Sequence, residues 1–202
     1  MGDPFQDRPY WDGWLETATR EELKALQERK LQAQVEWVFH RSPYWHERLR
    51  EAGLSPRDIR TVEDLAQVPF LDKKAFLEET ASPPYGHFLC YPLEEIERQG
   101  AIVYRTTGTT GRQGQFINTY EGWQLYGDEG IRLLWSGGMR PGDYILNTFP
   151  YSMWAAGWGF QFAARKAGFI LLAGVPPLDT SMRAGSWWTA GPRGSSSAHP
   201  KP

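Results

Sequence analysis

From residue 101 onward, short apolar runs alternate with longer segments of helical period, and this alternation constrains the fold more than any other feature. Strands are predicted over residues 101–105, 115–119, 144–148 and 169–173, and helices over residues 120–135 and 153–167. The first two strands flank a glycine- and threonine-rich loop, which predicts a hairpin. Strands that alternate with helices are typical of a layered α/β sheet with parallel pairing. The predicted fold class is therefore α/β.

The first ~80 residues carry helical signals instead. Thr19 is expected to cap a helix, and Glu22 completes a capping box with it. A second helix is predicted over residues 44–52, ended by Gly53. Asp72 is expected to cap a short helix over residues 73–79. A helical region thus precedes the α/β part.

Composition divides the chain into three parts. Residues 1–99 form the helical N-terminal region, and residues 100–184 form part of an α/β subdomain. Residues 185–202 contain four serines, three glycines and three prolines, but no acidic residue. A flexible tail is one interpretation of this segment. We favour the other, in which native sequence stops near Ala184 and the remainder is irregular, out-of-frame or otherwise foreign.

Charge and cysteine content exclude several classes of function. The formal net charge is −2, and no basic cluster is present, which argues against a nucleic-acid-binding protein. The single cysteine, Cys90, permits no internal disulfide, which favours a reducing compartment. No apolar segment approaches the about 20 residues that a membrane-spanning helix needs, and the first ten residues contain no apolar run. We expect a cytoplasmic protein without a membrane or nucleic-acid partner.

The loop after the first predicted strand is the main candidate for chemistry. It reads Thr106-Thr107-Gly108-Thr109-Thr110-Gly111-Arg112-Gln113-Gly114. Glycines allow backbone N–H groups to approach a phosphate closely, and threonine hydroxyls add further donors. Arg112 adds a cation that can pair with phosphate oxygens through two hydrogen bonds. Composition alone leaves two alternatives open, namely a phosphate-binding loop and an ordinary polar hairpin turn.

Better-known functional motifs do not match. No segment has the Gly-x4-Gly-Lys-Ser/Thr pattern of a P-loop, and Phe162 occupies the third glycine position of a dinucleotide fingerprint that would begin at Gly157. The four histidines lack metal-ligand spacing, so no metal site is predicted from them. Cys90 has no activating partner nearby in sequence and is expected to be a buried thiol.

Four segments carry a family resemblance, in this order: Ser42–Leu65 (with gaps), Val68–Lys73, Thr106–Arg112 and Gly138–Asp143, the last followed by Phe149-Pro150-Tyr151. Together they resemble the phenylacetate–CoA ligase family of adenylate-forming, AMP-binding enzymes. The third segment, Thr106 to Arg112, is similar to the family's Ser-Ser-Gly-Thr-Thr-Gly-Lys-Pro loop, although Arg112 replaces the usual lysine and Gln113 the proline. The resemblance covers roughly residues 35–184, and it is specific because the order and the spacing of the segments agree together.

The resemblance implies an activity and a set of site residues. Family members use ATP and Mg²⁺ to convert a carboxylic acid to an acyl-adenylate, and then transfer the acyl group to coenzyme A. Residues 100–184 would be part of the AMP-binding subdomain, with an aromatic or other carboxylic acid as substrate. The phosphate-binding residues would be Thr106, Thr107, Gly108, Thr109, Thr110, Gly111 and Arg112, and the acyl pocket would include Tyr151, Trp154 and Gly157.

Family members are considerably longer than this chain. The family's C-terminal lysine has no counterpart here, so no catalytic residue is assigned. We therefore interpret the chain as the N-terminal part of such a ligase, inactive by itself, with a homodimer as an expectation for the full-length parent. Two alternatives remain, namely a non-catalytic fragment that acts as an interaction module and an unrelated nucleotide-binding domain.

Overall fold

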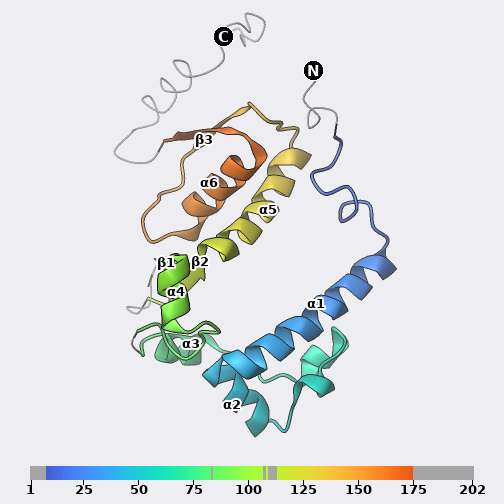
Figure 1. The fold of residues 1–202 in the computed structure, drawn as a ribbon, viewed down its shortest axis with the longest axis vertical. Coiled ribbons are helices and arrows are strands. Elements are labelled where there is room, and N and C mark those ends of the chain that lie inside the picture. Colours follow the sequence, from blue (N-terminus) through green and yellow to red (C-terminus); the bar gives the residue numbers. More distant parts are fainter. Residues whose placement is uncertain (1–7, 83, 107, 109–112, 175–202) are drawn as a thin grey trace, which may run out of the picture. The chain divides into compact units, whose positions relative to one another are not determined.

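The computed structural model describes residues 8–82, 84–106, 108 and 113–174. These residues form two compact units (Figure 1). One unit contains residues 10–123, and the other contains residues 8–9 and 124–174.

The first unit begins with a long helix, α1 (Arg20–Arg41). Its N-cap is Thr19, whose hydroxyl accepts from the Glu22 N–H while the Glu22 carboxylate accepts from the Thr19 N–H, so the predicted capping box is confirmed. The next helix, α2 (Pro43–Glu51), starts one residue earlier than predicted. Proline is tolerated in the first helical turn, because its missing N–H would have no partner there.

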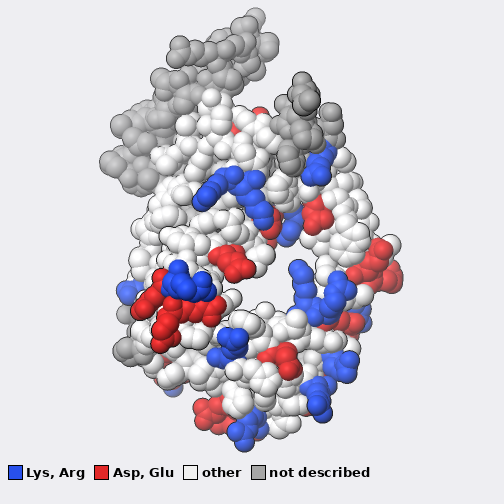
Figure 2. All heavy atoms as spheres, in the orientation of Figure 1, with Lys and Arg blue, Asp and Glu red and all other residues white. Residues whose placement is uncertain are grey.

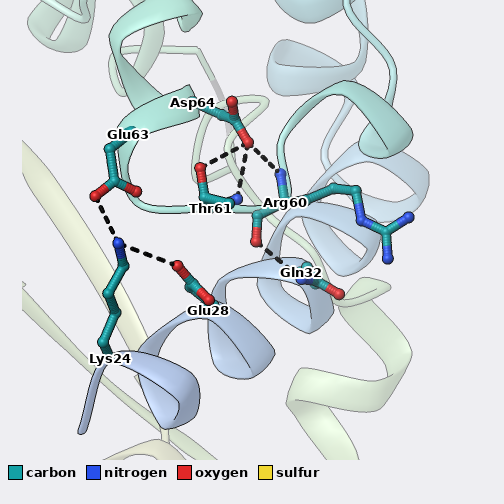
Figure 3. A network of polar contacts seen from close by, with 7 residues as sticks. All are labelled: Lys24, Glu28, Gln32, Arg60, Thr61, Glu63 and Asp64. Atoms are coloured by element: carbon teal, nitrogen blue, oxygen red, sulfur yellow. Dashed lines mark hydrogen bonds and ion pairs between the residues drawn. The ribbon is translucent and has the colours of Figure 1, made fainter. Parts of the chain in front are cut away.

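Two short 3₁₀ helices, η1 (Pro56–Asp58) and η2 (Glu63–Gln67), follow α2. They are tied to α1 by long-range polar contacts (Figure 3). The Gln32 side-chain amide donates to the Arg60 carbonyl at 2.8 Å. The Lys24 ammonium lies 2.8 Å from the Glu63 carboxylate. These contacts connect the first half of α1 to a segment 28 to 39 residues later.

Thr61 and Asp64 form a cap-like set of hydrogen bonds before η2. Oδ2 of Asp64 accepts from the Thr61 N–H at 2.8 Å and from the Arg60 N–H at 3.0 Å (Figure 3). The short helix that follows is a 3₁₀ helix, and its N-cap position is Val62. The carboxylate therefore organises the turn before the helix rather than closing an α-helical capping box.

Apolar side chains from α1, α2 and the segment after η1 form a core cluster in this unit. Val35, Leu49 and Ile59 are buried, and Ile59 is completely inaccessible. Around them pack four partly buried apolar residues: Leu31, Phe39, Leu54 and Val68. Burial of these side chains stabilises the packing of α1 against α2.

Hydrogen bonding lowers the pKa of four carboxyl groups in this unit. The donors are the Thr19 N–H for Glu22, the Ser55 hydroxyl for Asp58, the Lys24 ammonium for Glu63 and the Thr61 N–H for Asp64. A carboxyl group with a lowered folded-state pKa stabilises the fold above its unfolded pKa, and this contribution is lost as the pH falls through the folded value.

We therefore expect the free energy of unfolding to decrease as the pH is lowered from 7 through about 4, where unfolded carboxyl groups begin to bind protons. Urea titrations followed by far-ultraviolet circular dichroism at several pH values would measure this. The Asp64→Asn variant should show a shallower decrease, because one of the four groups no longer titrates. An unchanged free energy between pH 7 and 3 would contradict the assignment.

The remainder of the first unit leads to a hairpin. α3 (Lys73–Glu79) is capped as predicted, since the Asp72 carboxylate accepts from the Ala75 N–H at 2.8 Å. α4 (Leu93–Gln99) ends at Gly100. Strands β1 (Ala101–Arg105) and β2 (Gln115–Thr119) then pair antiparallel, with Ala101 opposite Thr119 and Arg105 opposite Gln115. The predicted hairpin is confirmed.

The helix α5 (Tyr120–Ser136) begins in the first unit and continues into the second. There, β3 (Tyr144–Asn147) and β4 (Ile170–Ala173) pair in parallel, joined through α6 (Ala155–Ala167). The predicted parallel pairing and the helix end at Gly168 (φ 76°) are confirmed. α6 starts two residues later than predicted, because Trp154 has extended backbone angles.

In the second unit, α5 and α6 lie side by side (Figure 1), and glycines on α5 allow the close approach. A Cβ on Gly127 would lie 3.2 Å from the Phe162 carbonyl carbon, and one on Gly130 would lie 3.1 Å from Cβ of Ala163. The buried apolar side chains of this unit are those of Ile131, Trp135, Phe162, Ala163, Ala164, Ala167 and Phe169. Helix packing against the parallel pair thus fixes the carboxyl end of β3, where the segment 148–154 begins.

The surface carries both signs of charge. On the face in Figure 2, Lys and Arg side chains are interspersed with Asp and Glu side chains. Several are paired, such as Lys166 with Asp128 at 2.8 Å. Within the described ranges, no helix has the length and apolar character needed to cross a membrane.

Candidate functional site

The predicted phosphate loop connects β1 to β2, and the structure fixes its two ends. The Thr106 N–H donates to the Gly114 carbonyl at 3.0 Å, and the Gly114 N–H donates to Oγ1 of Thr106 at 3.0 Å. One pair further down, the Arg105 guanidinium donates to Oε1 of Gln115 at 3.2 and 3.0 Å. The loop therefore starts and ends at a closed neck, and the Thr106 hydroxyl keeps its own proton for donation.

Within the loop, the structure describes Gly108, whose φ of 67° lies in the left-handed region that favours glycine. Thr107, Thr109, Thr110, Gly111 and Arg112 lie outside the described residues.

An aromatic row supports the neck of this hairpin. Gly114 is buried, and a Cβ at this position would overlap the Phe76 ring of α3. That ring lies 4.9 Å from the Phe116 ring of β2, which in turn stacks on the Tyr104 ring of β1 at 5.2 Å and 9°. Aromatic contacts of this kind add to the burial of apolar area. The base of the loop therefore rests on a packed surface.

A second candidate region lies where β3 ends. In parallel sheets, ligands bind at the carboxyl ends of the strands, and the segment 148–154 leaves β3 at that end. The last residue of β3, Asn147, has only 3% of its surface exposed. Its side-chain amide contacts three points of the following segment, namely the Phe149 N–H, the Tyr151 hydroxyl and the Gly157 carbonyl. The sequence does not mark this residue, because one asparagine at a strand end gives no distinctive pattern.

The three predicted acyl-pocket residues occupy different environments. Tyr151 is half-buried, and its ring meets the Trp158 ring edge-on at 5.4 Å and 89°. Gly157 is buried, and a Cβ there would lie 2.6 Å from the Pro150 carbonyl oxygen. Trp154 is 47% exposed, at the N-cap of α6. Asn147 thus brings Tyr151 and Gly157 together, and Trp154 makes no side-chain capping bond.

A separate cleft of about 210 Å³ lies between α5 and α6. None of the three predicted acyl-pocket residues (Tyr151, Trp154 and Gly157) is among its lining residues. The cleft is connected to the 148–154 segment through Phe160, whose ring stacks on that of Phe149 at 5.5 Å and 11°. The lining residues are Tyr126, Glu129, Gly130, Leu133, Ala156, Gly159 and Phe160.

The titratable side chains described near these regions have structural partners. Burial raises the pKa of the Cys90 thiol, with smaller opposing effects from Trp37 and Arg41, so its reactive thiolate form is disfavoured. His46 contacts the Phe39 carbonyl at 2.8 Å, and His87 pairs with Glu79 at 2.5 Å. In the described parts of the chain, no group of three His, Cys, Asp or Glu side chains is arranged to hold a metal ion.

Comparison with known proteins gives clear relatives. The chain is 33% identical over 158 residues to a phenylacetate–coenzyme A ligase of Thermus thermophilus, which covers 78% of this chain and 34% of the relative. A phenylacetate–coenzyme A ligase of Escherichia coli is 27% identical over 161 residues, with 78% and 34% covered. The chain therefore spans about a third of the length of the curated relatives that it matches. No protein-family model matches it.

Solved structures agree. A crystal structure of 2-hydroxyisobutyryl-CoA ligase in complex with 2-HIB-AMP and CoA superposes with a TM-score of 0.80 at 26% identity, covering 92% of this chain and 39% of that one. The same enzyme in its postadenylation state gives a TM-score of 0.76 at 24% identity, covering 86% and 36%, which supports the fold alone. The resemblance to phenylacetate–CoA ligases and the adenylate-forming ligase fold are thus confirmed.

Proposed function

We propose that this chain carries the ATP-phosphate loop and part of the acyl site of an acid–thiol ligase that activates a carboxylic acid as its adenylate. The identity of 33% to a phenylacetate–coenzyme A ligase over 78% of the chain carries this proposal. The closed neck between Thr106 and Gly114 supports it, because a phosphate loop needs fixed ends so that its backbone N–H groups converge.

In this proposal, residues 106–112 hold the β- and γ-phosphates of ATP. Gly108, with positive φ, allows the backbone to turn closely around a phosphate, and the Thr106 hydroxyl keeps a proton that it can donate. Electrostatic stabilisation by positioned donors is the main protein contribution to reactions at phosphate. ATP supplies the leaving pyrophosphate.

The acid would bind beside the segment 148–154, near Tyr151, Trp154 and Gly157. The Tyr151 ring, which packs edge-on against the Trp158 ring, offers an aromatic surface that suits an aryl acid. Coenzyme A as acyl acceptor rests on the ligases to which the chain is similar. Mg²⁺ stays a prediction from the resemblance, and among the described residues no group of three His, Cys, Asp or Glu side chains is arranged to hold it. A homodimer of the full-length parent and a cytoplasmic location stay predictions.

Replacement of Gly108 tests whether the loop binds ATP. We expect the wild-type chain to bind ATP, and the Gly108→Val variant to bind at least about 10-fold more weakly, since a β-branched residue is strained at positive φ. Isothermal titration with ATP measures this. The matched control is Gly138→Val, because Gly138 also has positive φ (91°) but lies in open space after α5. An equal loss of ATP binding in both variants would contradict the assignment of this loop as the ATP-phosphate site.

Turnover by the 202-residue chain is a separate question. We propose that this chain alone does not exchange pyrophosphate into ATP when phenylacetate is added, because residues that bind the adenosine are not among the motifs found in it. A pyrophosphate-exchange assay measures this directly. Clear exchange would show that the chain holds a complete adenylation site.

A further inference from the structure

The side chain of Asn147 has all of its hydrogen-bonding groups engaged. Its Nδ2 donates to the Tyr151 hydroxyl oxygen at 3.0 Å and to the Gly157 carbonyl at 3.1 Å. Its Oδ1 accepts from the Phe149 N–H at 3.1 Å. The partners also fix the orientation of the amide, because a backbone N–H faces the oxygen and a backbone carbonyl faces the nitrogen. A buried amide with every partner in place holds a defined geometry.

These bonds connect the end of β3 to the segment 148–154 and to the first turn of α6. Phe149 lies at the start of that segment, Tyr151 near its middle and Gly157 in the first turn of α6. The Asn147 backbone carbonyl additionally accepts from the Gly174 N–H at 2.9 Å, which ties the end of β3 to the end of β4. Asn147 is thus the point to which the segment after β3 is attached.

Tyr151 is held at both ends of its side chain. Its ring packs against Trp158, whose indole N–H donates to the Ser152 carbonyl at 3.2 Å. Its hydroxyl oxygen accepts from Asn147, so the phenolic proton must be donated elsewhere. Across the described ranges, no acceptor is recorded for that proton. The side chain is half-buried, so its hydroxyl is neither fully solvated nor sealed in the core.

We propose that the Tyr151 hydroxyl is a hydrogen-bond donor to an oxygen atom of the acid, and that Asn147 is a positioning residue that keeps it in this role. The proposal rests on the proposed function, which places the acid beside the segment 148–154. The accepting oxygen belongs either to the carboxylate or to a ring substituent of the acid. A bond accepted by the phenol oxygen from Asn147 strengthens the bond that its O–H donates, because linked hydrogen bonds polarise one another.

The proposal is tested by calorimetric titration of the full 202-residue chain with phenylacetate and with 4-hydroxyphenylacetate. We expect Tyr151→Phe to weaken binding about 3- to 10-fold, the range for one hydrogen bond. Weakening with both acids identifies the carboxylate as acceptor, and weakening with 4-hydroxyphenylacetate alone identifies the ring substituent. Equal affinities of the wild-type chain and Tyr151→Phe for both acids would overturn the proposal.

A double-mutant cycle separates positioning from general stability. Asn147→Ala should also weaken acid binding, and its effect should be smaller in the Tyr151→Phe background, because the part that acts through that hydroxyl is already lost there. The effect that remains reports the bonds of Asn147 to Phe149 and Gly157. Wild-type protein should show a tyrosine absorbance difference on acid binding that Tyr151→Phe lacks and Asn147→Ala reduces. Urea unfolding checks that each variant is folded at the assay temperature. Independent, additive effects of the two substitutions on acid affinity would contradict the role of Asn147.

A measurement of ATP binding distinguishes a failure of the inference about Tyr151 from a failure of the proposed function. If the folded wild-type chain binds ATP but neither acid, the inference about Tyr151 fails and the phosphate loop stands. If the chain binds an acid in a Tyr151-dependent way but does not bind ATP, the proposed function fails and the donor role of Tyr151 stands.

Discussion

Replacing Ile59 with alanine is expected to lower the free energy of unfolding by about 2–5 kcal/mol, the largest effect we predict for a single substitution. Ile59 has no exposed surface and packs with Val35 and Leu49 between α1, α2 and the segment after η1. The variant loses the burial of three carbon atoms and leaves a cavity in this cluster. Since domains are stable by about 5–15 kcal/mol, such a loss takes a large part of the total.

Two control variants show whether the loss of stability comes from the buried side chain of Ile59. Ile59→Val should cost only about 0.5–1.5 kcal/mol, because it removes one methyl group from the same site. Val62→Ala, three residues later, should change the free energy by no more than about 0.5 kcal/mol, because Val62 is 40% exposed. Urea unfolding followed by circular dichroism gives all three values. A loss below about 1 kcal/mol for Ile59→Ala would mean that Ile59 is not part of a packed core.

Gly157→Ala is expected to lower the free energy of unfolding by about 1–3 kcal/mol, although alanine is intrinsically favoured over glycine in a helix by about 1 kcal/mol. A Cβ at Gly157 would lie 2.6 Å from the Pro150 carbonyl oxygen and 3.0 Å from its carbon, so backbone must move. The movement would displace the first turn of α6 from the segment that carries Tyr151, and with it the Gly157 carbonyl that Asn147 contacts.

Gly159, two residues after Gly157 in α6, provides the matched control. A Cβ there would overlap the ring of Tyr126, which is the end of a 42% exposed side chain and not backbone. Gly159→Ala should therefore cost clearly less than Gly157→Ala in the same urea experiment. If the two variants have equal stability, the close backbone approach at Gly157 does not limit the packing of α6.

Local sequence signals predicted much of the fold, because the determining contacts are local. The Thr19–Glu22 capping box, the Asp72 cap and the left-handed Gly168 each involve residues only a few positions apart. The start of α6 was predicted wrongly at Met153. No capping side chain marks the boundary at Trp154, so the extended backbone there depends on the packing of the preceding segment.

The site was predictable only in part. Glycine and threonine content drew attention to the loop after Thr106, and the pairing of β1 with β2 confirmed its position in a hairpin. The neck bond from Gly114 to the Thr106 hydroxyl and the aromatic support from Phe76 were not predicted, because they depend on contacts across 8 residues and from another helix. Asn147 was missed for the same reason. Its bond to the Gly157 carbonyl forms only when α6 packs near the end of β3.

The most direct test of the central claim is a calorimetric titration of the folded wild-type chain with ATP, followed by competition with tripolyphosphate. If residues 106–112 hold the phosphates, ATP should bind saturably at one site per chain, and tripolyphosphate should compete with it because it offers the same phosphate oxygens without the nucleoside. Absence of saturable ATP binding by a chain that unfolds cooperatively in urea would contradict the assignment of this hairpin loop as a phosphate site.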